Sequence, residues 1–152
     1  IAVLLILGAT MFIRSNFGAL LTYHLLILGG ALLVGGSTWL YQTNHLNPAL
    51  WMVLTGLGLY IGYVPFGCVF FDRLIAAFRY SGNSGFMIYV ADAFGYLGSV
   101  AVLLYKNFGQ AGLSWLNFFI SAAYVLAAAG VVTILASGLF FIARYRQLAQ
   151  NP

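Results

Sequence analysis

The sequence predicts an all-α membrane protein, a polytopic transmembrane bundle of about five spanning helices. Only 5% of the 152 residues are charged, whereas a soluble domain of this size carries roughly a quarter charged residues. The mean hydropathy is +1.00. Long apolar segments alternate with short polar ones, and helices suit hydrocarbon because they satisfy every backbone amide within one segment.

The spans follow one another along the chain. The first apolar segment is shorter than the roughly 20 residues that a spanning helix needs, so we expect a truncated span in the carboxyl-terminal part of a longer protein. The next four segments exceed that length, and Pro48 suits the first turn of the third. The predicted bundle covers 1–143, with spans at about 1–13, 17–41, 49–78, 84–105 and 114–143, and with a cytoplasmic tail at 144–152.

The basic residues predict the orientation. When the five segments alternate in direction, Lys106 lies alone on one side and the other five basic residues share the opposite side: Arg14, Arg73, Arg79, Arg144 and Arg146. Because basic residues favour the cytoplasmic side, the carboxyl terminus is predicted to be cytoplasmic. Aromatic residues then fall near the two interfaces as an anchoring belt: Trp39, Tyr41, Trp51 and Trp115 outside, and Tyr80 and Tyr145 inside.

Asp92 is the strongest candidate for a functional residue, because it lies near the middle of the fourth span. It is one of two acidic residues in the chain and lies roughly 13 Å from the preceding polar turn. An ionisable group at that depth is costly and normally faces a cavity or a partner. Two interpretations are open: a carboxylate that contacts a substrate or carries a proton, and a carboxylate satisfied by a hydroxyl of a neighbouring helix.

Tyrosines accompany Asp92 on its own span and on the preceding one. The fourth span carries a stripe of small and polar residues at helical spacing: Gly85, Tyr89, Asp92, Tyr96 and Ser99. Tyr60 and Tyr63 share one face of the third span. We expect Tyr89, Tyr96, Tyr60 and Tyr63 to line a cavity with Asp92, and ordinary helix packing is the alternative.

The third span has features of a hinge and a gate. Pro65 removes one backbone hydrogen bond, and Gly62 belongs to a Gly58-xxx-Gly62 motif that permits close packing. Helices interrupted by glycine and proline mark moving elements in transporters, although a static kink fits the same residues. Asp72 and Arg73 follow at the basic side, where they form either a gate pair or a static ion pair with another helix.

No pattern indicates a metal, a cofactor or an enzyme. His24 and His45 lie 21 positions apart, roughly 30 Å along a helix, so they cannot ligate one haem iron. His24 suits either a hydrogen-bonded packing role or a proton partner for a carboxylate. The single Cys68 excludes an internal disulfide, and no phosphate loop, nucleophile triad or basic nucleic-acid stripe is present. We therefore expect no cofactor, no nucleic-acid partner and no enzymatic activity.

Two stretches carry a family resemblance: 65–78, PFGCVFFDRLIAAF, and 88–99, IYVADAFGYLGS. They resemble an uncharacterised family of bacterial multi-pass membrane proteins that in turn resembles the major facilitator superfamily. The resemblance implies the carboxyl-terminal half of a twelve-helix transporter in the bacterial inner membrane, with spans 49–78 and 84–105 beside its central cavity. The loop motif of that superfamily would fall at 14–16, where it is essentially absent.

Together these features predict the carboxyl-terminal part of a secondary transporter that moves a small solute by alternating access, with proton coupling through Asp92 as one mechanism. Its partners would be the lipid bilayer, the solute and the amino-terminal helices of the same protein. The alternative is a non-transporting scaffold or subunit that packs against partner helices. An intramembrane enzyme would need a second titratable group within reach of Asp92.

Overall fold

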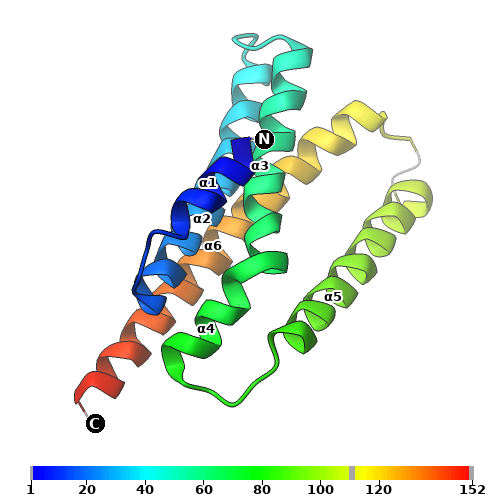
Figure 1. Ribbon diagram of the computed structural model, residues 1–152. Helices are drawn as coiled ribbons and strands as arrows, with labels where there is room; N and C mark the ends of the chain where they lie inside the picture. Colours follow the sequence, from blue (N-terminus) through cyan, green and yellow to red (C-terminus); the bar gives the residue numbers. More distant parts are fainter. Residues whose placement is uncertain (1, 110–111, 151–152) are drawn as a thin grey trace.

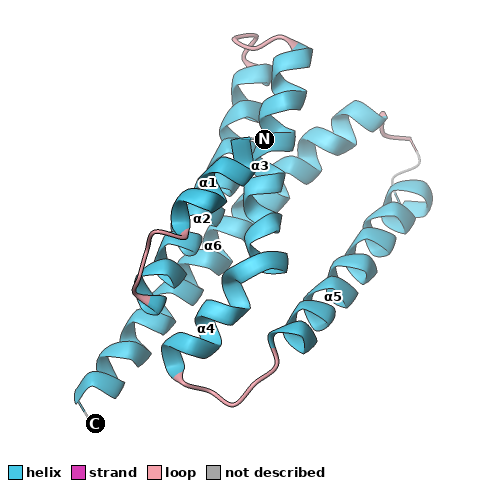
Figure 2. Ribbon diagram, in the orientation of Figure 1, coloured by secondary structure: helices cyan, strands magenta, loops and turns pink. Residues whose placement is uncertain are grey.

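The computed structural model describes residues 2–109 and 112–150, and every regular element in these ranges is helical (Figures 1 and 2). Six α-helices follow one another along the chain: α1 Ala2–Thr10, α2 Asn16–Gln42, α3 Pro48–Pro65, α4 Phe71–Phe78, α5 Ser84–Leu104 and α6 Trp115–Gln150. Two π-helical turns interrupt the longer spans: η1 Phe66–Phe70 after α3, and η2 Tyr105–Gly109 after α5.

Four stretches in the described residues are long and apolar enough to cross a membrane: Asn16–Gln42, Pro48–Phe78, Ser84–Gly109 and Trp115–Leu148. They make the chain an all-helical membrane protein. The predicted span 1–13 contains the nine-residue helix α1, which is too short to cross a bilayer. The predicted tail, 144–152, continues α6 as far as Gln150, and residues 151–152 lie outside the described residues.

Polar residues in the short connections fix where the spans begin. The Ser15 hydroxyl accepts a hydrogen bond from the Gly18 amide at 3.2 Å and caps α2. Asn47 caps α3 in the same way, 2.8 Å from the Leu50 amide, and Asn83 caps α5. Such caps satisfy amides that have no partner within the helix.

The core lies where α2 packs against α3 and α6, whereas α5 stands apart from them (Figure 1). α2 and α3 touch backbone to backbone at Gly30 and Gly58. A Cβ atom on Gly30 would lie 2.6 Å from the Gly58 carbonyl oxygen, and one on Gly58 would lie 2.7 Å from the Gly30 oxygen. The close approach therefore requires glycine at both positions.

Trp51 is buried between helices, unlike the other two tryptophans of the predicted interface belt. Its side chain is only 2% exposed, stacks on Tyr41 with ring centroids 4.1 Å apart, and donates from Nε1 to the Thr38 hydroxyl at 3.2 Å. Trp39 and Trp115, in contrast, are exposed. Trp51 is a packing residue because its indole N–H finds an acceptor inside the α2–α3 seam.

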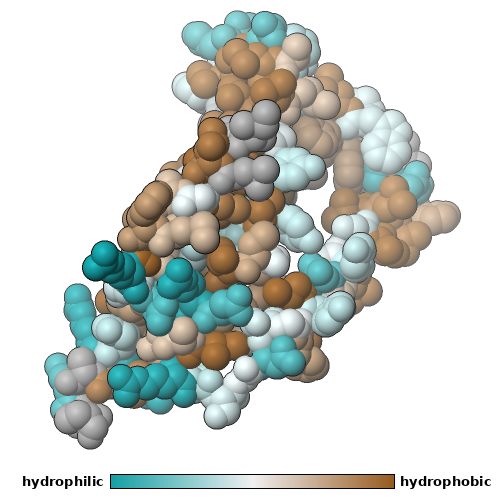
Figure 3. All heavy atoms as spheres, viewed as in Figure 1, coloured by the Kyte–Doolittle hydropathy of each residue, from teal (hydrophilic) through white to brown (hydrophobic). Residues whose placement is uncertain are grey.

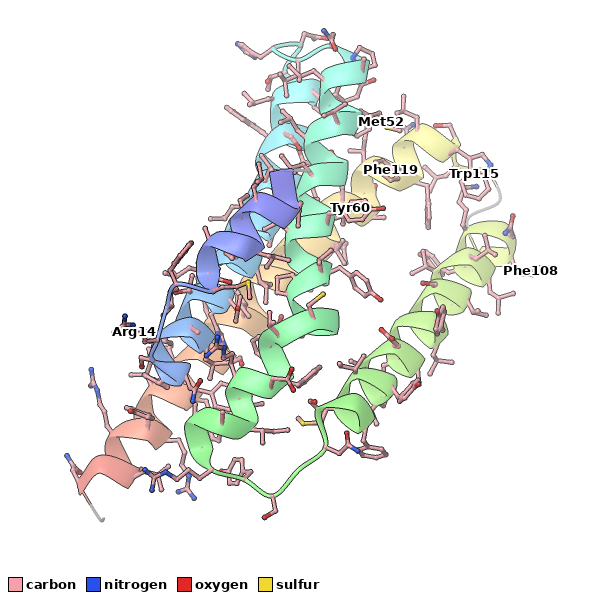
Figure 4. All side chains as sticks on the ribbon, viewed as in Figure 1. Arg14, Met52, Tyr60, Phe108, Trp115 and Phe119 are labelled. Atoms are coloured by element: carbon pink, nitrogen blue, oxygen red, sulfur yellow. The ribbon has the colours of Figure 1, made fainter. Side chains whose placement is uncertain are left out.

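The two ends of the long helices carry the hydrophilic residues, and apolar side chains cover the region between them (Figure 3). Arg14 marks the connection between α1 and α2 (Figure 4). This connection, the α4–α5 connection at 79–83 and the end of α6 lie toward one end of the molecule (Figure 1). We call it the basic end, because it holds Arg14, Arg79, Arg144 and Arg146.

Candidate functional site

A hydrogen bond joins two of the predicted site residues across the space between α3 and α5. The Tyr63 hydroxyl donates to Oδ1 of Asp92 at 3.1 Å. Tyr63 lies fifteen residues from each end of the span Pro48–Phe78, so the pair is at mid-depth. Asp92 is half-buried and Tyr63 is exposed. The carboxylate therefore has a hydroxyl partner without being sealed from its surroundings.

Two cavities lie between the helices, and the pair reaches the second of them through Tyr63, since Asp92 is not among the residues that line either cavity. The larger, about 790 Å³, is bounded by α3, α5, η2, α6 and the segment before α6, and it reaches Val34 on α2. The second, about 670 Å³, lies among α2, α3 and α6, reaches Ser99 on α5, and has Tyr63 in its wall. Val34, Leu59 and Leu126 line both, so the two cavities adjoin. Figure 3 shows the hollow between α5 and the rest of the molecule.

The cavity walls are apolar in their chemistry. Four serine or threonine residues line them, and each hydroxyl is already hydrogen-bonded within the protein. Ser99 donates to the Gly95 carbonyl oxygen at 2.9 Å; Thr133, Ser121 and Thr55 have their partners in Ala129, Asn117 and Ser37. A solute in these cavities would therefore meet mainly hydrocarbon and aromatic surface.

None of the other three predicted tyrosines forms a hydrogen bond with Asp92 among the described residues. Tyr60 lies on α3, on the side facing α5 (Figure 4), and its side chain is 65% exposed. Tyr89 and Tyr96 lie on α5 and are 78% and 75% exposed. Among the described residues, Asp92 forms its side-chain hydrogen bond with Tyr63 alone. A shared cavity lined by all four tyrosines stays a prediction.

The predicted hinge residues lie where the third span changes its helical form. α3 ends at Pro65, and the wider π turn η1 follows before α4 resumes the α-helical pattern. Proline lacks the amide that an α-helix needs at this point, and π turns inside helices are frequent at functional sites. Gly62, one turn earlier, lines the second cavity beside Tyr63.

The predicted gate residues lie toward the basic end. Arg73 donates from Nη1 to Oδ1 of Asn16 at 2.7 Å, which ties α4 to α2. Asp72 is exposed on α4, and no described basic residue forms an ion pair with it. The structure thus gives Arg73 an amide partner instead of a carboxylate, and the gate role stays a prediction.

The family model of DUF5690, described as a family of unknown function, matches residues 1–144. The chain belongs to DUF5690. This membership agrees with the resemblance to an uncharacterised family. No curated protein and no solved structure matches the chain.

In this DUF5690 chain, His24 joins α2 to α6. Its Nδ1 lies 2.8 Å from the Leu20 carbonyl oxygen, and its Nε2 lies 3.1 Å from the Ser137 hydroxyl. Because a carbonyl can only accept, Nδ1 carries a proton and donates to Leu20, and the hydroxyl of Ser137 is the partner of Nε2. His24 is a packing histidine without a carboxylate partner, and the described residues contain no group of three or more metal-ligating side chains.

Sequence reasoning missed two features of the DUF5690 structure. Lys106 is 4% exposed and holds its ammonium 4.8 Å from the centre of the Trp115 ring; their shared place at one end of the bundle was the available signal. The shared cavity residues Val34, Leu59 and Leu126 had no signal, because apolar side chains facing a cavity and facing lipid have the same hydropathy.

Proposed function

We propose that this DUF5690 chain is part of a secondary transporter that moves a small solute across a membrane by alternating access. The observation that carries the proposal is the Asp92–Tyr63 hydrogen bond at mid-depth, with Tyr63 in the wall of the second cavity. A carboxylate in a membrane span is costly, and such groups normally either are satisfied by partners or serve a function. One exposed hydroxyl is a weak partner set for a half-buried carboxylate, which favours a functional role.

In this proposal Asp92 contacts the solute or carries a coupling proton. Tyr63 holds the carboxylate in place when neither solute nor proton is bound to it. When the carboxylate is neutralised, the tyrosine hydroxyl loses its charged acceptor, and the link between α3 and α5 weakens. Occupancy of the site is thereby coupled to the separation of the two helices. Tyr60, Tyr89 and Tyr96 would line the passage as α5 approaches α3.

Pro65 and Gly62 would provide the hinge. The π turn after Pro65 already departs from the α-helical hydrogen-bond pattern, so a change of bend there breaks fewer backbone hydrogen bonds than elsewhere in the span. Gly62 has open space where a Cβ atom would lie, so no side chain of this turn would obstruct a bend toward the cavity.

The proposal extends to the surroundings of the protein. With the basic end in the cytoplasm, the membrane would be the bacterial inner membrane, and the helices would pack with further helices of the same protein as in the major facilitator superfamily. These assignments come from the charge pattern and the sequence resemblance.

A non-transporting scaffold is the second candidate, and the exposure of α5 favours it. No residue of α5 is buried, as expected for a helix that packs against helices of a partner protein. In that case the space beside Tyr63 would be filled by protein, and neither side of the membrane would give access to it.

Cysteine labelling of the full-length protein in sealed vesicles separates the two candidates. In a Cys68→Ser background, we expect Ser99→Cys in the cavity wall to react with a membrane-impermeant maleimide added to either side. Leu97→Cys, about 200° around the same helix and 65% exposed, is the matched control and should stay unreactive in lipid, because only thiolates react quickly. Reaction of Ser99→Cys from one side only, or from neither, would contradict alternating access.

A further inference from the structure

We infer that the two adjoining cavities, which Asp92 meets through its hydrogen bond to Tyr63 in the wall of the second, bind a lipophilic cation. Such a ligand is a mainly apolar molecule with one positive charge, for example a hydrophobic amine in its protonated form. The inference rests on the proposed transport function and names its substrate class. Three properties of the site carry it: the apolar walls, the sign of the charge at mid-depth, and the size of the space.

The walls select an apolar body. Removing a polar group from water without a new hydrogen bond costs roughly 1–3 kcal/mol in proteins. The wall offers few groups that could replace those hydrogen bonds: Ser99, Ser121 and Thr133 already donate their protons to backbone carbonyls and Thr55 is bonded to Ser37, so these hydroxyls offer a solute mainly acceptor positions. A sugar or another polyhydroxylated solute would therefore lose more hydrogen bonds than it gains.

The carboxylate selects a positive charge. Tyr63 occupies one position on Oδ1 of Asp92, and a carboxylate has about four acceptor positions on its two oxygens. The remaining positions suit an N–H donor or a diffuse cation. Two aromatic residues, Tyr63 and Phe66, also line the second cavity, and the faces of aromatic rings attract cations.

No other titratable or charged group described in the structure places a positive charge beside Asp92, so the charge there stays negative. Lys106 is fourteen residues beyond Asp92, roughly 21 Å along the helix, and its ammonium lies over the Trp115 ring. Arg73 donates to Asn16 near the basic end. His24 is hydrogen-bonded to Leu20 and Ser137 between α2 and α6. The charge at mid-depth is therefore that of Asp92.

The volume fits an organic molecule and exceeds what an inorganic ion needs. The cavities measure about 790 and 670 Å³, within the range of roughly 300–1,000 Å³ that holds drug-sized ligands. Tetraphenylphosphonium is a suitable probe because it is apolar, aromatic and permanently charged. Tetraphenylborate has nearly the same size and shape with the opposite charge.

The test measures binding of both probes to the purified full-length protein in neutral detergent by titration calorimetry. We expect tetraphenylphosphonium to bind at least tenfold more tightly than tetraphenylborate, and to bind at least tenfold more weakly to Asp92→Asn. Asp72→Asn, which removes the same charge from the exposed start of α4, should bind like the unaltered protein. Asp92→Glu keeps the charge and should retain most of the affinity, and elution as a single peak shows that each variant is folded.

Equal affinity for the two probes, or an Asp92→Asn variant that binds tetraphenylphosphonium as tightly as the unaltered protein, would overturn the inference. The binding assay involves no transport, so the two proposals fail separately. Charge-selective binding without two-sided labelling of Ser99→Cys would overturn transport and keep the cation site. Two-sided labelling without charge-selective binding would keep transport and overturn the cation site.

Discussion

α2 and the span that begins with α5 are alike in sequence and opposite in packing. The spans have 27 and 26 residues, with hydropathies of 2.0 and 1.7. Nine residues of α2 are buried, and none of α5 is. Because lipid is as apolar as leucine, hydropathy places both helices in the membrane but does not decide which of them packs against protein.

The difference arises from small residues and side-chain hydrogen bonds. α2 contacts α3 through Gly30 and forms polar links to other helices: His24 to Ser137, Ser37 to Thr55, and Thr38 to Trp51. Among the described residues of α5, Asp92 alone forms a side-chain hydrogen bond with another helix. We therefore regard α2 as the fixed centre of the bundle and α5 as the element that can move.

The largest difference is expected between leucine-to-alanine substitutions on α2 and on α5, measured as the loss of unfolding free energy. Leu20→Ala on α2 removes a side chain that is 0% exposed, and the resulting cavity should cost about 3 kcal/mol of unfolding free energy. Leu97→Ala on α5, at a side chain that is 65% exposed, should change it by no more than about 0.5 kcal/mol. The measurement is unfolding in mixed micelles with increasing sodium dodecyl sulfate. Equal losses would contradict the assignment of α2 to the core.

A smaller effect is expected where α2 and α3 touch. A Cβ atom on Gly30 would meet backbone atoms of both Gly58 and Gly62, at 2.6 and 3.0 Å, so Gly30→Ala must push the helices apart at a cost of about 1–3 kcal/mol. Gly29→Ala is the matched control, because its Cβ would have nothing within 4 Å. The same detergent titration compares them. If Gly30→Ala is as stable as Gly29→Ala, the backbone contact is not what holds α2 to α3.

Trp51 provides a third comparison, between a buried and an exposed indole. Trp51→Phe removes the hydrogen bond to Thr38 and leaves that hydroxyl without its donor, which should lower the unfolding free energy by about 1–2 kcal/mol. Trp39→Phe, at a side chain that is 58% exposed, should leave it nearly unchanged. Quenching of tryptophan fluorescence by brominated lipids should also be stronger for Trp39 than for Trp51, and the reverse order would contradict the burial of Trp51.

Much of the fold could be predicted from the sequence, since hydropathy and the capping residues Ser15, Asn47 and Asn83 set where the spans begin. The pairing of helices could not, because it depends on which glycine meets which backbone: the motif pointed to Gly58 and Gly62, but Gly30 on α2 is the residue that completes the contact. Of the site, the sequence indicated Asp92 and Tyr63 by their depth and by the spacing of their neighbours. It did not indicate that Asp92 would bond Tyr63 and none of the other tyrosines, since that choice depends on how α5 stands against α3.

The smallest expected effect concerns the link between α5 and the bundle. Tyr63→Phe removes the hydrogen bond to Asp92 and keeps the ring, and interhelical hydrogen bonds in membranes contribute on average about 0.6 kcal/mol. Such a loss hardly changes the unfolding free energy of the whole protein. However, the lost hydrogen bond is the single side-chain bond between α5 and α3 in the described residues. We therefore expect Tyr63→Phe to broaden the distribution of distances between two spin labels. The labels are attached at Met52→Cys on α3 and Leu103→Cys on α5, both exposed positions, in a Cys68→Ser background.

The control is Tyr60→Phe, which lies on the same helix as Tyr63 and forms no hydrogen bond with Asp92. It should leave the distance distribution unchanged. A distribution that Tyr63→Phe does not broaden would mean that the turn at 79–83 and contacts outside this pair hold α5 in place, and the site would then not be coupled to helix movement through Tyr63.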